Sequence, residues 1–327
     1  ALYHKLGIPA VLVETMPLSL YDPWVPPFTS GLIPKQTSIS RLGIRLAWEK
    51  IVIARKIRNL FFSMLLCRQD YFSLYKRLFL ECGFPFEEKI DWRRPFIIGI
   101  KESKILSMNP SSLDFPRKYP PNCQYAPSRV DLMREDPMLN QRYARVMEEV
   151  CLQKQQRPDT KIIYCFSSTV MGFEKRSKII FMKIRDICLR NPQFVFILSV
   201  GKYHNTSYLL PCPSNLYVFQ QVPQLYLLSY CDLMITSGGM NSIAECIEKE
   251  VPMLVCPLSL KSDQLGNSAR VVYHGLGLRA RIKLDSSRTI EKRIVQLFEN
   301  YATFKRNLSM MRTKILAEST AINTEVI

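Results

Sequence analysis

The stretch LMITSGGMNS, Leu233 to Ser242, decides the fold of the second half of this chain. Its apolar first part ends at Gly238 and Gly239, and a helical spacing of apolar residues starts directly after them. This order predicts a strand and a helix joined by a turn with no bulky side chain in the way. The backbone N–H groups at the start of the helix, together with the positive end of its dipole, then face an open crevice that suits an anion.

Polar residues continue along the first turns of the expected helix. Asn241 and Ser242 add hydrogen-bond donors, and Glu245 lies one turn further along the same face, within reach of sugar hydroxyls. Each of these residues also has a plainer explanation. The two glycines suit any tight turn, and Glu245 alone could be a solvated helix residue. Their order together favours a binding site over those alternatives.

A second polar turn follows a second apolar strand, residues 253–256. It carries the pair Asp263-Gln264 and then Asn267. Such residues are common in ordinary loops, but open α/β sheets bind ligands beyond the carboxyl ends of their strands, where this turn is expected. Donors for a diphosphate, an acceptor for ribose hydroxyls and a carboxylate–amide pair together predict a pocket for a nucleotide sugar.

The segment Val222 to Gly277 resembles the donor-binding signature of the nucleotide-diphosphate-sugar glycosyltransferases. That family includes UDP-glucuronosyltransferases and the bacterial macrolide and carotenoid glycosyltransferases. Here the signature reads PQLYLLSYCDLMITSGGMNSIAECIEKEVPMLVCPLSLKSDQLGNSARV. The resemblance covers about fifty residues with most signature positions filled, and it is much weaker over the rest of the chain.

The resemblance implies a role for each donor-site residue. Gln224 is expected to meet the edge of the uracil base, Glu245 the ribose hydroxyls, and Asp263 with Gln264 the transferred sugar. The strand-turn IIYCFSST is similar to a family motif that places Thr169 near a phosphate. The full set of donor-site residues is Thr169, Gln224, Ser237, Gly238, Gly239, Asn241, Ser242, Glu245, Asp263, Gln264 and Asn267.

Three positions depart from the family pattern. Ser237 stands where a histidine that donates to the diphosphate is usual, so phosphate affinity is expected to be lower or to come from Lys261. Ser168 stands where the family usually has a glycine, and its side chain is expected to narrow the approach of a phosphate to Thr169. Gln221 occupies the place of the base-stacking tryptophan of the plant branch, which argues against that branch.

Strands and helices alternate after residue 160, which predicts a parallel sheet. The fold class expected is α/β, with two Rossmann-like domains of the GT-B glycosyltransferase type, of which the N-terminal one is incomplete. At 327 residues and 47% hydrophobic, the chain is long enough for two domains. We expect a partial acceptor-binding domain at 1–157 and a nucleotide-sugar-binding domain at 158–327, whose last helix crosses back to the first.

The beginning of the chain reads as the last turn of a helix followed by a strand, residues 8–14. In the family a similar segment lies about a hundred residues into the protein, so the general base and its orienting carboxylate are expected upstream of Ala1. His4 is better explained as a surface or packing residue. The catalytic residues are therefore unknown, and the chain as given is expected to be weak or inactive in transfer.

Composition limits the remaining possibilities. Ten scattered cysteines without a Cys-x-x-Cys pair, and only three histidines, indicate a reducing cytoplasm and no structural zinc. No apolar run reaches the roughly 18–20 residues of a membrane span. The net charge is +17, yet no nucleic-acid recognition motif is present.

Residues 40–68 are predicted to form a long basic helix. Its cationic residues alternate with Trp48, Phe61 and Phe62, the composition of a helix lying in a membrane interface. A core-packed helix with a solvated basic face explains the same pattern. Peripheral contact of this helix with the inner face of an anionic membrane is therefore one of two interpretations. The cations are Arg41, Arg45, Lys50, Arg55, Lys56, Arg58 and Arg68.

The function predicted is transfer of a hexose-type sugar from a UDP-sugar to a hydroxyl of a small lipophilic acceptor. The resemblance implies inversion and no metal, because helix N–H groups carry the diphosphate charge, and the UDP-sugar is a co-substrate with no cofactor needed. A nucleotide-sugar epimerase also has a glycine turn followed by a glutamate, but the Pro-Gln and Asp-Gln pairs argue against it. A non-catalytic module that binds nucleotide sugars or a membrane surface is the third possibility.

Overall fold

The structure is a computed structural model that describes residues 5–8, 10–95, 99–101, 103–127, 130–133, 141–166, 174–201 and 205–325. The chain divides into two compact units, Ala1–Ser128 with Ala321–Ile327, and Arg129–Thr320. The division lies before the boundary expected at residue 157. The reason is helix α5 (Gln141–Gln156), whose Tyr143 ring packs edge-on against Phe219 of the second unit, with ring centroids 5.6 Å apart.

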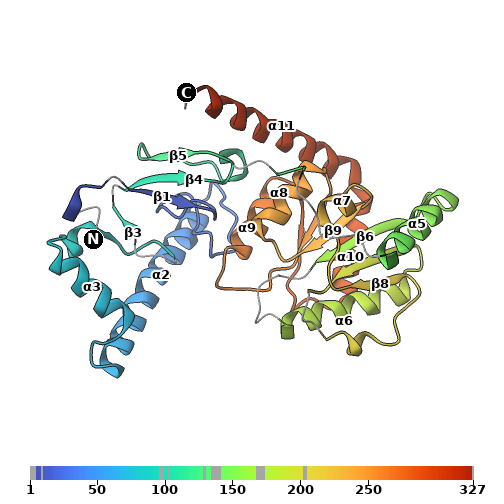
Figure 1. The fold of residues 1–327 in the computed structure, drawn as a ribbon, viewed down its shortest axis with the longest axis horizontal. Coiled ribbons are helices and arrows are strands. Elements are labelled where there is room, and N and C mark those ends of the chain that lie inside the picture. The colour runs from blue at the N-terminus through green and yellow to red at the C-terminus, as the bar shows by residue number, and fades with distance from the viewer. Residues whose placement is uncertain are drawn as a thin grey trace. The chain divides into compact units, whose positions relative to one another are not determined.

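The first unit holds a three-stranded parallel sheet in the order β1-β4-β5 (Figure 1). Beside it lie a pair of long helices and a short antiparallel strand pair, β2 with β3. A buried ion pair of 2.9 Å joins Arg94 to Glu14 at the end of β1. The elements are β1 (Val11–Glu14), α2 (Ser38–Leu65), α3 (Tyr71–Glu81), α4 (Phe86–Lys89), β2 (Ile90–Asp91), β3 (Gly99–Ile100), β4 (Lys104–Ser107), a short 3-10 helix (Ser111–Leu113) and β5 (Cys123–Tyr125).

The structure corrects the prediction for the basic helix. Helix α2 ends at Leu65 and not at residue 68, because Cys67 and Arg68 take left-handed backbone angles, with φ of 47° and 62°. Trp48 is fully buried, and its indole N–H donates to the carbonyl of Val25 at 2.9 Å. Arg55 is buried too, with its guanidinium on the carbonyl oxygens of the β2–β3 segment. Neither side chain belongs to a solvated basic face.

The second unit is built on a six-stranded parallel sheet in the order β11-β10-β9-β6-β7-β8. This confirms the parallel sheet that the alternation of strands and helices predicted. The strands are β6 (Lys161–Phe166), β7 (Phe194–Ser199), β8 (Leu216–Phe219), β9 (Leu233–Thr236), β10 (Met253–Val255) and β11 (Gly277–Arg279). The helices, besides α5, are α6 (Glu174–Arg190), a 3-10 turn (Ser207–Leu209), α7 (Gln224–Leu228), α8 (Met240–Glu248), α9 (Gln264–Tyr273), α10 (Ser287–Glu299) and α11 (Tyr301–Glu325).

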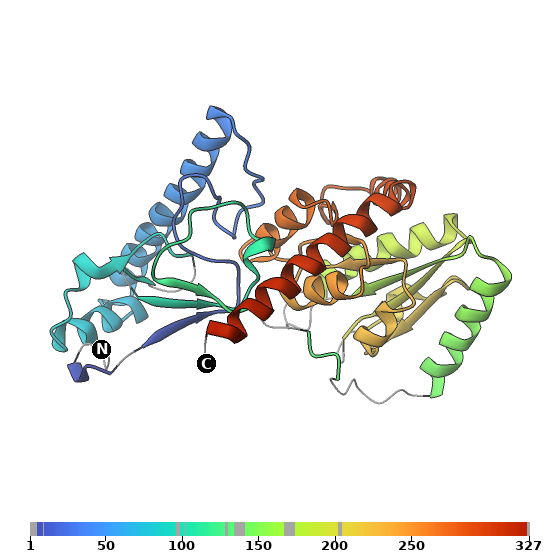
Figure 2. The same cartoon turned by 90° about the horizontal axis from the view of Figure 1, so that it is seen from above.

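The core of this unit is the sheet itself. All six positions of β7 are buried, which requires cover on both faces of the sheet. Helices lie on both sides of it (Figures 1 and 2). Ile184 of α6 and Ile294 of α10 are among the fully buried side chains of the cluster that covers the strands.

The strand order also indicates where a ligand is expected to bind. From β6 the chain continues to β7 on one side of the sheet, whereas β9 pairs with β6 on the other side. Open α/β sheets bind ligands at such a point of reversal, beyond the carboxyl ends of the two strands. The turn after β9 is the segment that contains Gly238 and Gly239. The turn after β6, with Ser168 and Thr169, lies outside the described residues.

Candidate functional site

The turn between β9 and α8 needs glycine for two different reasons. Gly238 has a φ of 87°, and a β-carbon there would lie 2.7 Å from Cγ1 of the buried Val255. Gly239 has ordinary backbone angles, φ −66° and ψ 141°, and precedes the first turn of α8. A β-carbon on Gly239 would meet nothing within 4 Å among the described residues. Gly238 therefore shapes the turn, and Gly239 leaves open space above it.

The N-terminus of α8 is available to a ligand. No side chain in the described parts of the chain caps its first N–H groups. Uncapped N–H groups and the positive end of the helix dipole attract a phosphate or a carboxylate. Ser242 in the first turn is buried, whereas Asn241 is exposed at the surface. The arrangement has the chemistry that the sequence predicted for a diphosphate.

Three side chains form a hydrogen-bonded chain beside this turn. The Gln224 amide nitrogen donates to a Glu245 carboxylate oxygen at 2.8 Å, and the Tyr164 hydroxyl donates to the Gln224 amide oxygen at 3.0 Å. Glu245 and Tyr164 are only 4% and 1% exposed. Burial raises the pKa of Tyr164 well above its ordinary value, so this phenol stays a donor. The structure thus brings together the residues expected to meet the base and the ribose.

The second polar turn is tied to the first by Asn267. Its amide nitrogen donates to the carbonyl oxygen of Gly238 at 2.8 Å and to the Asp263 carboxylate at 2.9 Å. Asn267 is fully buried, so these contacts hold two turns that are distant in sequence in one arrangement. Burial raises the pKa of Asp263, an effect that the hydrogen bond from Asn267 opposes.

Gln264 lies at the start of α9, directly after Asp263. Its amide oxygen accepts hydrogen bonds from the backbone N–H groups of Leu258 and Ser259, at 2.8 and 2.9 Å. This oxygen therefore shapes the loop after β10. The loop also receives a hydrogen bond from the Arg176 guanidinium of α6, on the carbonyl oxygen of Leu258. Only the amide nitrogen of Gln264 remains for a sugar hydroxyl.

Residues 205–317 match the family described as UDP-glucoronosyl and UDP-glucosyl transferase. This segment, about a third of the chain, is therefore similar to the UDP-glycosyltransferases. The chain is 37% identical over 98 residues to the NDP-glycosyltransferase YjiC of Bacillus subtilis, a match that covers 30% of this chain and 24% of that protein. It is 34% identical over 101 residues to zeaxanthin glucosyltransferase of Pantoea ananas, covering 31% of this chain and 22% of the relative. The matched segment thus spans about a quarter of these relatives.

Solved structures extend the likeness in fold to nearly the whole chain. The glycotransferase of kitacinnamycin has a TM-score of 0.59 at 18% identity, covering 97% of this chain and 69% of that one. The calicheamicin glycosyltransferase CalG4 has a TM-score of 0.60 at 15% identity, covering 99% and 68%. The fold is therefore of the GT-B type with two Rossmann-like domains, as predicted.

Ser237, which stands at the family's usual histidine position, is 5% exposed and follows β9 directly. In the described part of the chain its hydroxyl makes no hydrogen bond, whereas Lys261 is exposed on the β10–α9 loop. Tyr164 was missed by sequence reasoning, because within an apolar strand it reads as one more core residue. Its position two residues before the strand's end was the only available signal.

Among the residues that the structure describes, no helix is long and apolar enough to cross a membrane. The same residues contain no group of three or more His, Cys, Asp or Glu side chains placed to hold a metal ion.

Proposed function

We propose that this chain binds a UDP-sugar and belongs to an enzyme that transfers the sugar, a hexose, to a hydroxyl of a small lipophilic acceptor. The observation that carries the proposal is the Gln224–Glu245 pair beside the uncapped start of α8. One carboxylate can accept from two ribose hydroxyls, and the adjacent helix N-terminus can hold a diphosphate. A nucleoside diphosphate presents these groups in that order.

The proposed reaction is an inverting displacement. The acceptor oxygen attacks the anomeric carbon, the bond from that carbon to the diphosphate oxygen breaks, and UDP leaves with the electron pair. The acceptor gives up its proton to a general base, for which we name no residue. The N–H groups of the first turn of α8 stabilise the negative charge that develops on the leaving diphosphate. In this scheme the N-terminus of α8 stabilises the negative charge of the leaving diphosphate, and no metal ion is needed.

Calorimetry of UDP binding, with uridine as comparison, tests the donor site. We expect UDP to bind more tightly than uridine, because uridine lacks the diphosphate. Glu245→Ala should weaken UDP binding by about 1.5–3 kcal/mol, roughly ten- to a hundredfold, because two hydroxyls lose a charged acceptor. Glu299→Ala, at an exposed position on α10, is the matched control and should bind UDP normally. Equal affinity for UDP and uridine would show that α8 holds no diphosphate.

We also propose that the first unit makes peripheral contact with an anionic membrane. Helix α2 carries exposed apolar side chains, among them Ile57, Phe61 and Met64, at 63%, 59% and 70% exposure. Arg45 and Lys50 are exposed on the same helix. Binding to anionic liposomes at low salt, lost at high salt, is expected. Equal recovery on neutral and anionic liposomes would contradict it.

A further inference from the structure

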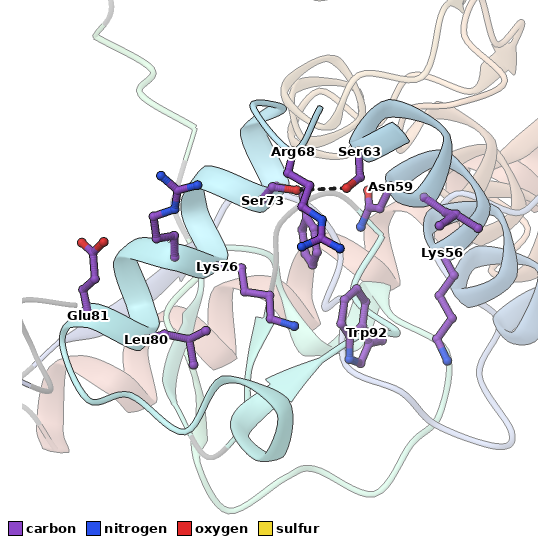
Figure 3. Close-up of a pocket in the computed structure, with 12 residues that line it drawn as sticks. Lys56, Asn59, Ser63, Arg68, Ser73, Lys76, Leu80, Glu81 and Trp92 are labelled. Atoms are coloured by element: carbon purple, nitrogen blue, oxygen red, sulfur yellow. Dashed lines mark hydrogen bonds between the residues drawn. The ribbon is translucent and has the colours of Figure 1, made fainter. Parts of the chain in front are cut away.

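The first unit contains a pocket of about 700 Å³ between helices α2 and α3 (Figure 3). Four of its lining residues are cationic, Lys56, Arg68, Lys76 and Arg77, against one carboxylate, Glu81. Its other seven lining residues are uncharged. A pocket with this excess of positive charge favours an anion.

Most of this positive charge is not neutralised by the protein. Lys76 forms an ion pair with Glu87. Lys56, Arg68 and Arg77 form no ion pair within the parts of the chain that the structure describes. Three unpaired cations around one pocket repel one another, so an anion that binds between them relieves the repulsion.

The turn that carries Arg68 is held in an unfavourable backbone conformation. Cys67 and Arg68 both have positive φ, which costs free energy in residues with a β-carbon. Figure 3 shows the Arg68 side chain reaching into the pocket from this turn. The start of α3 directly after the turn is fixed by Asp70, which accepts from the N–H groups of Phe72 and Ser73 at 3.0 and 3.1 Å. The turn therefore holds the Arg68 guanidinium at the pocket, directly before the capped start of α3.

The inner wall of the pocket can also contact a ligand with polar atoms. The side-chain amide nitrogen of Asn59 is buried there without a hydrogen-bond partner among the described residues. Phe72 and Trp92 provide an apolar surface, with ring centroids 5.4 Å apart and ring planes at 49° to one another. Lone phosphate would satisfy the amide and the cations, but it would leave the aromatic surface uncovered.

Exposed apolar side chains lie on both helices that form the pocket, and two of them, Leu60 and Leu80, line the pocket itself. On α2 and the turn, Leu60, Phe61, Met64, Leu65 and Leu66 are 46–70% exposed. On α3, Leu74, Leu78 and Leu80 are 47–52% exposed. Exposed apolar surface beside a cationic pocket matches a molecule with a charged head and hydrocarbon chains.

We propose that this pocket holds the phosphate headgroup of an anionic membrane lipid, while the exposed apolar side chains of both helices enter the interface. The inference deepens the proposed membrane contact, on which it rests, and is independent of the donor site. A phosphomonoester headgroup fits best, because it carries up to two charges and three acceptor oxygens for the unpaired cations.

Vesicle flotation tests the proposal with three lipid compositions. These are phosphatidylcholine alone, phosphatidylcholine with phosphatidic acid, and phosphatidylcholine with phosphatidylglycerol at matched surface charge. We expect preferential binding to phosphatidic acid. Lys56→Gln with Arg68→Gln should abolish this preference. Arg45→Gln with Lys50→Gln removes the same charge from exposed positions of α2, so it should weaken binding to both anionic vesicles and keep the preference.

Arg68→Gly separates loss of the headgroup from loss of the fold. Glycine suits the left-handed backbone of the turn, so this variant should keep or raise the Tm while losing the preference. Equal binding to phosphatidic acid and phosphatidylglycerol vesicles would contradict the headgroup site. Equal loss of binding in the two double variants would contradict it too. Either result would leave the general membrane contact of the first unit in place.

A soluble assay distinguishes a lipid from free phosphate. Short-chain phosphatidic acid below its micelle concentration should change the fluorescence of Trp92, which lines the pocket, and Trp92→Phe should remove that change. Binding of the short-chain lipid without vesicle binding would support the pocket and contradict the membrane contact. Inorganic phosphate bound as tightly as the short-chain lipid would overturn the lipid assignment.

Discussion

The amide nitrogen of Gln224 lies 2.8 Å from a carboxylate oxygen of Glu245, and the two residues come from different helices, α7 and α8. The Tyr164 hydroxyl of β6 donates to the amide oxygen of Gln224. This hydrogen bond keeps the amide nitrogen of Gln224 turned toward the Glu245 carboxylate. A donor site that reads both a base and a ribose needs such a fixed orientation.

Removing the Tyr164 hydroxyl tests whether it orients Gln224. Tyr164→Phe keeps the ring but deletes one hydrogen bond, so UDP affinity should fall by about 1 kcal/mol, roughly fivefold. Tyr217→Phe is the matched control, because its hydroxyl bonds to Glu149 of α5, away from Gln224 and Glu245. Titration calorimetry on both variants decides the matter. Equal affinities for the two would leave Tyr164 as a packing residue.

The two glycines of the β9–α8 turn should respond differently to alanine. Gly238→Ala places a methyl group 2.7 Å from Val255 at a φ of 87°, so we expect a loss of more than about 1 kcal/mol in the free energy of unfolding.

Gly239→Ala should fold normally but weaken UDP binding, because its methyl group fills the open space over the turn. Denaturant melts combined with UDP titrations separate the two effects. If Gly239→Ala bound UDP as well as the native protein, the diphosphate would not pass over this turn.

Restoring histidine at position 237 tests the departure from the family pattern. Ser237→His should tighten UDP binding below about pH 6.5, where an imidazole gains a proton and pairs with the diphosphate. Ser262→His, on the β10–α9 loop, serves as the comparison. Affinities measured from pH 5.5 to 8 without any gain for Ser237→His would mean that this side chain points elsewhere or that Lys261 already fills the role.

Asp263 should make stability depend on pH. Burial raises its pKa in the folded protein, so the folded state holds the proton more tightly than the unfolded state does. The contribution of Asp263 to the free energy of unfolding is therefore complete below the ordinary aspartate pKa of about 3.9. It is lost as the pH rises through the raised pKa of the folded state.

Asp263→Asn should remove this part of the pH dependence. Unfolding free energies from denaturant melts of the two proteins, compared across that window, measure it. A difference between native protein and variant that stays constant, or grows with pH in favour of the native protein, would contradict the prediction.

Features whose parts are neighbours along the chain could be predicted from the sequence. The strand, glycine turn and helix at residues 233–248 follow from local spacing, and the parallel sheet follows from the alternation of strands and helices. A glycine turn and the helix start that follows it need only a few consecutive residues, so residue types and their spacing predict them. The family signature lies in the same short segments.

The tertiary structure decided every feature that joins distant segments. Tyr164 reaches Gln224 because β6 pairs with β9, and Asn267 reaches Gly238 because α9 follows β10 beside that same strand. Arg55 and Trp48 look like members of an interfacial helix, yet backbone carbonyls of other segments hold them inside. Spacing along one helix cannot show this, because burial depends on which other segment packs against each side chain.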